Sequence, residues 1–294
     1  MQKMLGNKKV IFLFLFPGLL LFSVFYLIPI AFTGALSFTD WNGVKLSGIV
    51  FSGVGNFKEA LTSNAFWKGI MNTLIILIVQ IFIQIPITVA LAIALSFCTK
   101  GLKFSKTAFF IPYVLSATAV AMLWARVYDV DYGLINRLLN SFGINYQQMW
   151  LSDTKTVLGA LLLPMVWRSI GYYLIILYAG VKSIPKDYLE AALIDGCNSW
   201  QSSIKITVPL LRNTINVVVV LAAVGALREY PLIYVMTSGG PFNASTTPAI
   251  LMYSESFLKM RFGYGSAVAV LLIMECLLVS TFINKVFPSK ELQY

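Results

Sequence analysis

Few residues in this chain could do chemistry. The sequence contains no histidine, and its three cysteines, Cys98, Cys197 and Cys276, lack metal-ligand or redox spacing. Histidine-based triads and most transition-metal sites are therefore excluded. No GxSxG motif or cluster of paired carboxylates offers another catalytic centre. We expect no catalytic residue and no metal site, so the remaining candidates are charged and aromatic side chains inside apolar segments.

Two groups of such side chains stand out. They are Trp167, Arg168 and Tyr172 in one apolar segment, and Arg228, Glu229 and Tyr230 in another. A charge inside a bilayer is expensive and usually faces the protein interior. These side chains could line a path for a polar molecule by offering hydrogen bonds and flat apolar faces. Alternatively, the charges pair across helices as structural contacts, and the tyrosines mark membrane interfaces.

The composition is that of a membrane protein. Of 294 residues, 58% are apolar and 12% are charged, and the mean hydropathy is +0.80. A soluble domain carries about 25% charged residues, so lipid must surround much of the surface. The net charge of +10 comes from basic residues scattered between apolar runs. No basic stripe with interleaved aromatic residues points to nucleic acid.

Six segments are long enough to cross a bilayer, which takes about 20 mostly apolar residues. The expected spans are about 10–32, 73–95, 107–125, 157–180, 213–236 and 262–283. The predicted fold class is therefore an all-α membrane protein, with one transmembrane domain over 1–294. The first span follows a basic start but is too long for a signal peptide, so we expect it to be retained.

Basic residues in the loops predict the orientation. With both termini inside, the cytoplasmic segments hold twelve lysines and arginines, and the opposite side holds eight together with six acidic residues. The twelve are Lys3, Lys8, Lys9, Lys100, Lys103, Lys106, Lys182, Lys186, Lys205, Arg212, Lys285 and Lys290. This excess predicts cytoplasmic termini.

The segment 181–212, between the fourth and fifth spans, is predicted to fold as a helix–turn–helix. Pro185 marks the start of a first helix and Gly196 marks its end. Asn198 or Ser199 can cap a second short helix. Pro209 is expected to stop that helix before the fifth span begins.

The first helix of this loop has a thin apolar face. Leu189, Ala192 and Leu193 share the face, with Glu190 and Asp195 at its edges. Such a face suits insertion into a groove of another protein. It could equally pack beneath the helix bundle.

The loop resembles the EAA loop of binding-protein-dependent ABC importer permeases. The residues that carry this resemblance, or are placed by it at the ATPase contact, are Glu190, Ala191, Ala192, Leu193, Asp195, Gly196, Ile206, Pro209, Leu210 and Leu211. In that family the loop lies on the cytoplasmic side and inserts into a cleft of the ATP-hydrolysing subunit. Cys197 and Asn213 depart from the common pattern, where an alanine and a proline are usual.

Further segments look like elements of the sugar-importing branch, in particular its maltose-type and glycerol-phosphate-type first permease subunits. They are 53–61, 133–136, 237–241 and 263–267. The resemblance implies a type I importer fold in the bacterial cytoplasmic (inner) membrane. It also implies four partners besides lipid: a second permease chain, usually a different one, two ATPase subunits and an extracytoplasmic sugar-binding protein.

The implied function is import of a sugar or oligosaccharide by alternating access. The chain has no GxxxxGK[ST] loop, so ATP and Mg are expected on the partner ATPase and no cofactor or enzymatic activity is expected here. Glu190 is expected to pair with a basic residue of the ATPase, and Gly196 to permit close approach. The alternative is a secondary transporter or channel subunit without an ATPase, which would not need this loop.

Overall fold

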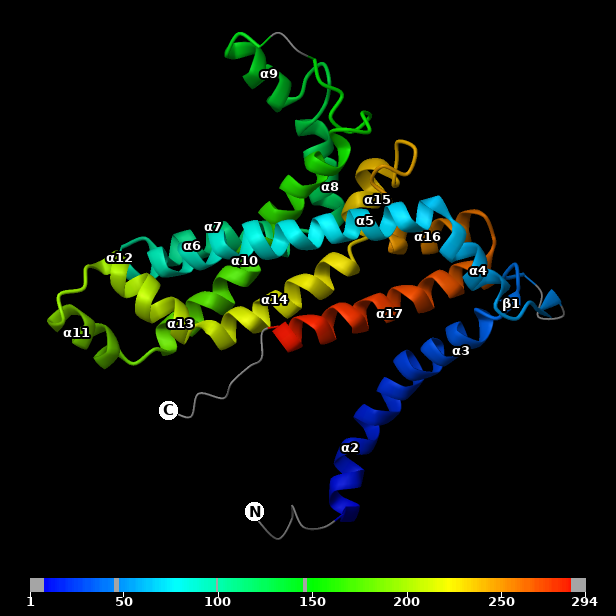
Figure 1. The fold of residues 1–294 in the computed structure, drawn as a ribbon, viewed down its shortest axis with the longest axis horizontal. Coiled ribbons are helices and arrows are strands. Elements are labelled where there is room, and N and C mark those ends of the chain that lie inside the picture. Colours follow the sequence, from blue (N-terminus) through cyan, green and yellow to red (C-terminus); the bar gives the residue numbers. More distant parts are fainter. Residues whose placement is uncertain (1–7, 45–47, 99, 145–146, 287–294) are drawn as a thin grey trace. The chain divides into compact units, whose positions relative to one another are not determined.

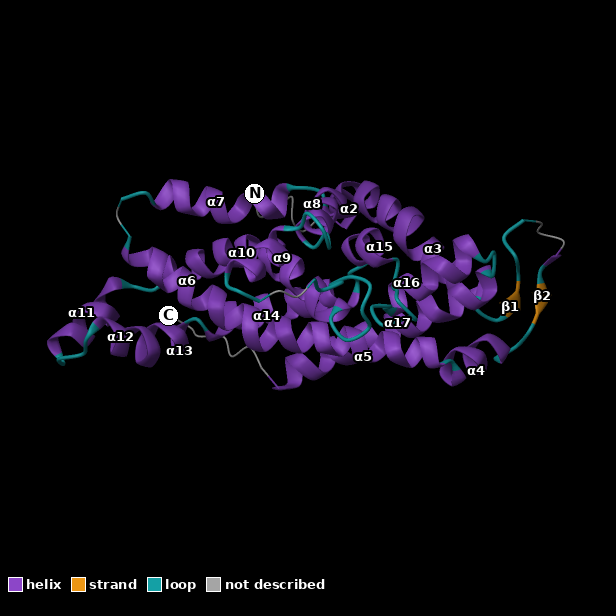
Figure 2. Ribbon diagram, turned by 90° about the horizontal axis from the view of Figure 1, so that it is seen from above, coloured by secondary structure: helices purple, strands orange, loops and turns teal. Residues whose placement is uncertain are grey.

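The protein is described from a computed structural model that covers residues 8–44, 48–98, 100–144 and 147–286. Regular structure in these ranges is helical apart from one two-stranded hairpin (Figure 2). The chain forms two compact units. The first contains the chain up to Ser63 together with Leu251–Leu272, and the second contains Asn64–Ile250 and the chain from Ile273 onward.

The first unit begins with a long apolar helical stretch. Its elements are α2 (Lys8–Phe22), the π-helical turn η1 (Ser23–Leu27), α3 (Ile28–Leu36), β1 (Thr39–Asp40), β2 (Val50–Phe51), α4 (Gly55–Thr62) and the π-helical turn η5 (Ser254–Leu258). The strands pair antiparallel with Thr39 opposite Phe51. Two helices cross between the units: α16 (Pro248–Tyr253) and α17 (Phe262–Val286).

The second unit contains most of the helices. Its elements are α5 (Asn64–Val79), the π-helical turn η3 (Gln80–Gln84), α6 (Ile85–Phe97), α7 (Leu102–Val114), α8 (Ala117–Val127), α9 (Leu134–Ser141), α10 (Val157–Ser183), α11 (Lys186–Ile194), α12 (Ser199–Ser202), the π-helical turn η4 (Ser203–Thr207), α13 (Val208–Leu210), α14 (Arg212–Leu227) and α15 (Pro231–Thr237). Helices α10 and α14 run side by side, and α11 lies at one end of this unit (Figure 1).

Helix α10 is central because it contributes to two apolar clusters. Leu174 and Leu177 pack with Val218 of α14 in one cluster, and Leu161 packs with Leu232 of α15 in the other. A glycine lets α7 approach the same helix closely. A Cβ at Gly171 would collide with the backbone carbonyl of Phe109, so any larger residue here would push α7 away.

Five helical stretches are long and apolar enough to cross a membrane, and one bent helix pair would make a sixth. The five are Ile11–Leu36, Asn64–Phe97, Val157–Ser183, Arg212–Thr237 and Phe262–Val286. They overlap five of the six predicted spans, although the second begins well before residue 73. The helix continues through Lys68 because backbone bonding, unlike hydropathy, tolerates one charged side chain near an end.

The predicted third span, 107–125, is not one continuous helix. The segment is split into α7 and α8, which are bent by 96° (Figure 1). Leu115 and Ser116 have extended backbone, and the Ser116 hydroxyl accepts a hydrogen bond at 3.1 Å from the N–H of Ala119 to start α8. Serine is one of the preferred residues at an N-cap. Pro112, at the end of α7, further disfavours a continuous helix.

The fifth span is also interrupted. Helix α14 ends at Leu227 and α15 begins at Pro231, so Arg228 and Glu229 lie in a short break rather than within a helix. The cytoplasmic placement of both termini stays a prediction, and its residues Lys3 and Lys290 lie outside the described ranges.

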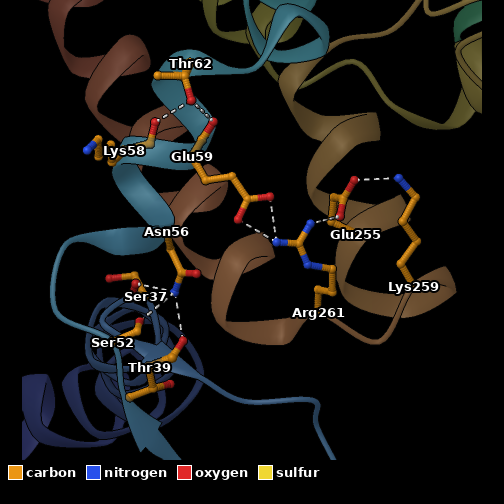
Figure 3. A network of polar contacts seen from close by, with 10 residues as sticks. All are labelled: Ser37, Thr39, Ser52, Asn56, Lys58, Glu59, Thr62, Glu255, Lys259 and Arg261. Carbon is orange, nitrogen blue, oxygen red and sulfur yellow. Dashed lines mark hydrogen bonds and ion pairs between the residues drawn. The ribbon is translucent and has the colours of Figure 1, made fainter.

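An ion-pair network ties together segments of the first unit that are far apart in the sequence. We call Glu59, Glu255, Lys259 and Arg261 the Arg261 network (Figure 3). Arg261 Nη2 donates to both carboxylate oxygens of Glu59 at 2.7 Å, and Nη1 donates to Glu255 at 3.2 Å. Lys259 Nζ lies 2.7 Å from Glu255. The Glu59 carboxylate raises the pKa of Arg261 above its usual value, so this side chain stays charged.

A neighbouring amide fixes α4 to the preceding loop. Asn56 is buried, and its Nδ2 donates to the carbonyls of Ser37 and Thr39 at 3.0 and 2.8 Å (Figure 3). Buried polar groups need such partners, so α4 is held in one position beside the Arg261 network.

Candidate coupling loop and intramembrane polar site

The coupling loop, residues 181–212, folds as the sequence predicts in its first half. Helix α11 ends with the N–H of Gly196 bonded to Leu193 O at 3.1 Å and the N–H of Cys197 bonded to Ala192 O at 2.9 Å. This pair of bonds is a Schellman motif, which requires a left-handed residue. Gly196 has φ +81, and nothing lies within 4 Å of where its Cβ would be. Backbone conformation, rather than space, is therefore what demands glycine here.

The second half of the loop begins with a full capping box. Asn198 Oδ1 accepts from the N–H of Gln201 at 2.8 Å, and Gln201 Oε1 accepts from the N–H of Asn198 at 3.0 Å. This confirms Asn198 as the cap. The helix runs on through η4 and α13, which tolerates proline in its first turn, and ends at Leu210, one residue after Pro209 and before α14 begins at Arg212.

The predicted apolar face of α11 was partly wrong. Ala192 is 3% exposed and Leu189 is half-buried, so both face the protein, whereas Leu193 is exposed. The larger exposed apolar side chains are ones that the prediction left out: Ile194, 87% exposed, and Trp200, 73% exposed. The helix packs through its small residues and presents its larger ones outward.

Charged residues of the loop are exposed as well. Asp187, Glu190 and Asp195 lie at the surface together with Ala191. None of these three carboxylates forms an ion pair within the part of the chain that the structure describes. The outer surface of α11 therefore combines apolar side chains with unpaired negative charge.

The base of the loop belongs to the core of the membrane helices. Val181 and Ile184 at its start and Leu211 at its end are buried in the same cluster as Leu174 and Val218. A packed cluster moves as a unit because interiors are close-packed. A force on α11 would thus reach α10 and α14.

A groove of about 750 Å³ lies beside the second half of the loop. It is lined by Trp200 and Ile204 from the loop, by Phe97 and Ile93 from α6 and by Val219 from α14. Its lining is almost wholly apolar, so it does not suit a sugar.

The first predicted polar group lies on α10 and gathers aromatic residues around Arg168. The Arg168 guanidinium lies 5.9 Å from the ring centroid of Tyr113, and that ring stacks on Tyr172 at 4.6 Å with an angle of 11°. Trp167 meets Trp124 edge-on at 5.8 Å. Arg168 Nε is buried and has no hydrogen-bond partner among the described residues.

The second predicted polar group lies at the break between α14 and α15. Glu229 accepts a hydrogen bond from the N–H of Leu232 and interacts electrostatically with Arg168. The two form no direct ion pair among the described residues, and Glu229 Oε1 is buried there without a hydrogen bond. Tyr230 stacks on Tyr234 at 5.1 Å, whereas Arg228 is exposed.

The structure therefore brings Arg168, Tyr172 and Glu229 into one polar site and leaves Arg228 at the surface. The prediction missed Tyr113 and Trp124, whose indole Nε1 is also buried without a hydrogen bond among the described residues. No signal in the sequence pointed to them, because the bend that places them was not predicted. Aromatic faces beside unsatisfied donors and acceptors are suited to a polyhydroxylated ligand.

Comparison with known proteins settles the family. Residues 10–291 match the family described as binding-protein-dependent transport system inner membrane component. The chain belongs to this family. It is thus an inner membrane component of a binding-protein-dependent transport system.

Individual relatives of this inner membrane component are named as transport permeases. It is 33% identical over 271 residues to a probable ABC transporter permease protein of Pyrococcus horikoshii, with 92% of each chain covered. It is 32% identical to the multiple sugar-binding transport system permease protein of Streptococcus mutans, with 91% of each covered. Its fold matches a crystal structure of a bacterial alginate ABC transporter in complex with an alginate pentasaccharide-bound periplasmic protein. That match has a TM-score of 0.83 and 21% identity, and it covers 97% of this chain and 96% of the other.

Proposed function

We propose that the chain is the permease subunit of an ATP-driven ABC importer for a sugar or oligosaccharide. An extracytoplasmic binding protein delivers the substrate, and a second permease chain and two ATPase subunits complete the assembly. Family membership supports the assignment of the chain to a binding-protein-dependent importer. The sugar class is supported by the Streptococcus relative and the alginate transporter, whose names state what they carry.

The observation that carries the proposal is the outward surface of the coupling loop. Ile194 and Trp200 are among the most exposed apolar side chains outside the membrane-spanning helices, and Ile194 lies one helical turn after the unpaired Glu190 on α11. Exposed apolar residues beside charge are typical of a docking surface. We assign the ATPase contact to Glu190, Ala191, Leu193 and Asp195, with Ala192, Gly196 and Pro209 shaping the loop.

The proposed mechanism uses the loop as a lever. ATP and Mg bind the partner ATPases, whose closure shifts α11. The shift passes through Ile184 and Leu211 into α10 and α14, which carry Arg168 and lead to Glu229. The polar site then opens to one side of the membrane or the other, as alternating access requires.

Transport in proteoliposomes tests the proposal. We expect uptake of a labelled oligosaccharide to require ATP, the ATPase subunits and the binding protein. Uptake without the ATPase that follows an ion gradient would instead establish the secondary-transporter alternative.

The polar site has its own test. Arg168→Ala should lower uptake about tenfold. The bound sugar would lose a hydrogen bond from a buried, charged donor. The same complex should retain its ATPase. Arg137→Ala, at an exposed arginine of α9, is the matched control and should keep wild-type uptake. Equal uptake in the two variants would exclude Arg168 from the path.

A further inference from the structure

A second groove, of about 340 Å³, runs along α7 and α10 and differs from the first in having a cationic end. Lys106 and Thr107 line that end, and the rest of the lining is apolar: Phe110, Ile111, Val114, Leu115 and Ile175. Residues three or four apart share a helix face, so the α7 residues form one stripe that passes from charged to apolar.

Lys106 lines the cationic end of the groove, and Lys182 lies near it at the ring of Tyr178. Lys106 Nζ lies 3.5 Å from the ring centroid of Tyr178, and Lys182 Nζ lies 5.7 Å from the same centroid. Lys182 also donates to the carbonyl of Ser96 at 2.9 Å, which fixes its position. One aromatic ring thus holds two like charges near each other, an arrangement that favours an anion beside them.

No carboxylate in the described ranges forms an ion pair with these lysines. The only charged residues in 98–115 are Lys100, Lys103 and Lys106. Across the described residues, ion pairs occur only within the Arg261 network. The positive charge is therefore available to a ligand.

The groove lies where a membrane lipid would reach it. Helix α7 begins and α10 ends at the same end of the second unit as the coupling loop (Figure 1). If that end is cytoplasmic, as the proposed function requires, the lysines face the leaflet surface that carries anionic lipids. Basic pockets between membrane helices on this side hold anionic head groups.

We propose that this groove binds an anionic phospholipid, with its phosphate at Lys106 and Lys182 and an acyl chain along Phe110, Ile111 and Val114. A free phosphate would use only the lysines. The apolar stretch, in which Val114 is 69% exposed, adds a contact that a free phosphate cannot make. The site lies on α7 and on α10, the helix that leads into the coupling loop, so bound lipid would restrain how these two helices pack.

Native mass spectrometry of the purified complex tests the site. We expect dioleoyl phosphatidylglycerol to be retained about tenfold more tightly than dioleoyl phosphatidylcholine, because two lysines near the surface each favour anionic lipid. Lys106→Gln with Lys182→Gln should abolish the preference, and Lys106→Arg should keep it. Lys285→Gln, at an exposed lysine near the end of α17, is the matched control and should change nothing.

A second variant tests the acyl groove. Ile111→Trp with Val114→Trp should fill the groove and weaken retention of both lipids while Lys106 remains. Displacement of the lipid by inorganic phosphate alone would assign the lysines to a soluble anion and overturn the proposal. Equal retention of the two lipids by the wild type would also overturn it. ATPase co-purification, measured on the same samples, reports on the proposed function separately, since lipid retention does not depend on it.

Discussion

In the Arg261 network, four charged side chains neutralise one another, whereas Asp187, Glu190 and Asp195 in the coupling loop have no ion-pair partner among the described residues. The contrast extends to burial. Glu255 is 5% exposed, but all three loop carboxylates are at the surface beside Ile194 and Trp200. Charge that is paired internally fixes the position of a segment, and charge left unpaired beside apolar surface is free for a partner.

The two regions also differ in the hydrogen bonds that hold their backbone in place. Asn56 ties α4 to the loop before it through long-range hydrogen bonds. The coupling loop depends on local motifs, the Schellman end at Gly196 and the capping box at Asn198. Local motifs keep the loop folded while its outer surface remains uncovered.

The largest effect should come from charging the apolar surface of the coupling loop. Ile194→Lys should lower retention of the ATPase about tenfold or more, since anchors of this kind dominate an interface. Its side chain is 87% exposed, so folding should be unaffected. The measurement is quantitative co-purification of the ATPase from membranes.

The control for this variant lies in the first unit, which contains the Arg261 network. Phe51→Lys changes a side chain that is 77% exposed on β2. It should retain the ATPase fully. Equal loss of the ATPase in both variants would mean that exposed apolar residues do not distinguish the two regions.

Removal of Arg261 should affect stability rather than coupling. Arg261→Ala leaves the buried Glu255 with Lys259 alone. We expect the free energy of unfolding to fall by about 1–3 kcal/mol, the usual range for an unsatisfied buried group. Thermal unfolding in detergent measures this, and the ATPase should still co-purify.

Glu59→Gln refines the same prediction. The Arg261–Glu59 pair is about half exposed on both sides, and exposed pairs contribute about 0–1 kcal/mol. The loss should therefore be smaller than for Arg261→Ala. If Glu59→Gln destabilised the chain more, the internal pairing of Glu255 would not be the source of stability.

The most local effect should come from the capping box. Asn198→Ala removes the side chain that accepts from Gln201, and loss of an N-cap costs about 1 kcal/mol. Hydrogen exchange of the amides of α12 should speed up about fivefold. Asn140→Ala on α9, an exposed asparagine that starts no helix, is the control and should leave α12 unchanged.

Much of the fold could be predicted because hydropathy and helix signals are local. The apolar runs, the Gly196 end and the Asn198 cap were all visible in the sequence. The bend between α7 and α8 was not, because Pro112 and Ser116 lie within a run that holds no charged residue between Lys106 and Arg126.

The candidate site was predictable only in part, for a related reason. Arg168 and Glu229 stood out as charges in apolar segments, but their placement beside Tyr113 depends on contacts between α7 and α10. Burial of Ala192, with Ile194 facing outward, likewise depends on how α11 packs on the rest of the loop. Periodicity identifies a helix face without saying which side is covered.

The most direct test of the docking surface is a pull-down of the tagged chain from its native membrane, with Glu190→Lys and Gly196→Val compared with Gly143→Val. Gly143 also ends a helix with positive φ, +80, and nothing lies within 4 Å of its Cβ position. The account predicts that an ATPase and a second permease co-purify with the wild type and with Gly143→Val. It also predicts that the ATPase is lost from Glu190→Lys and Gly196→Val. Retention of the ATPase by both coupling-loop variants, or its absence from the wild type, would contradict the account.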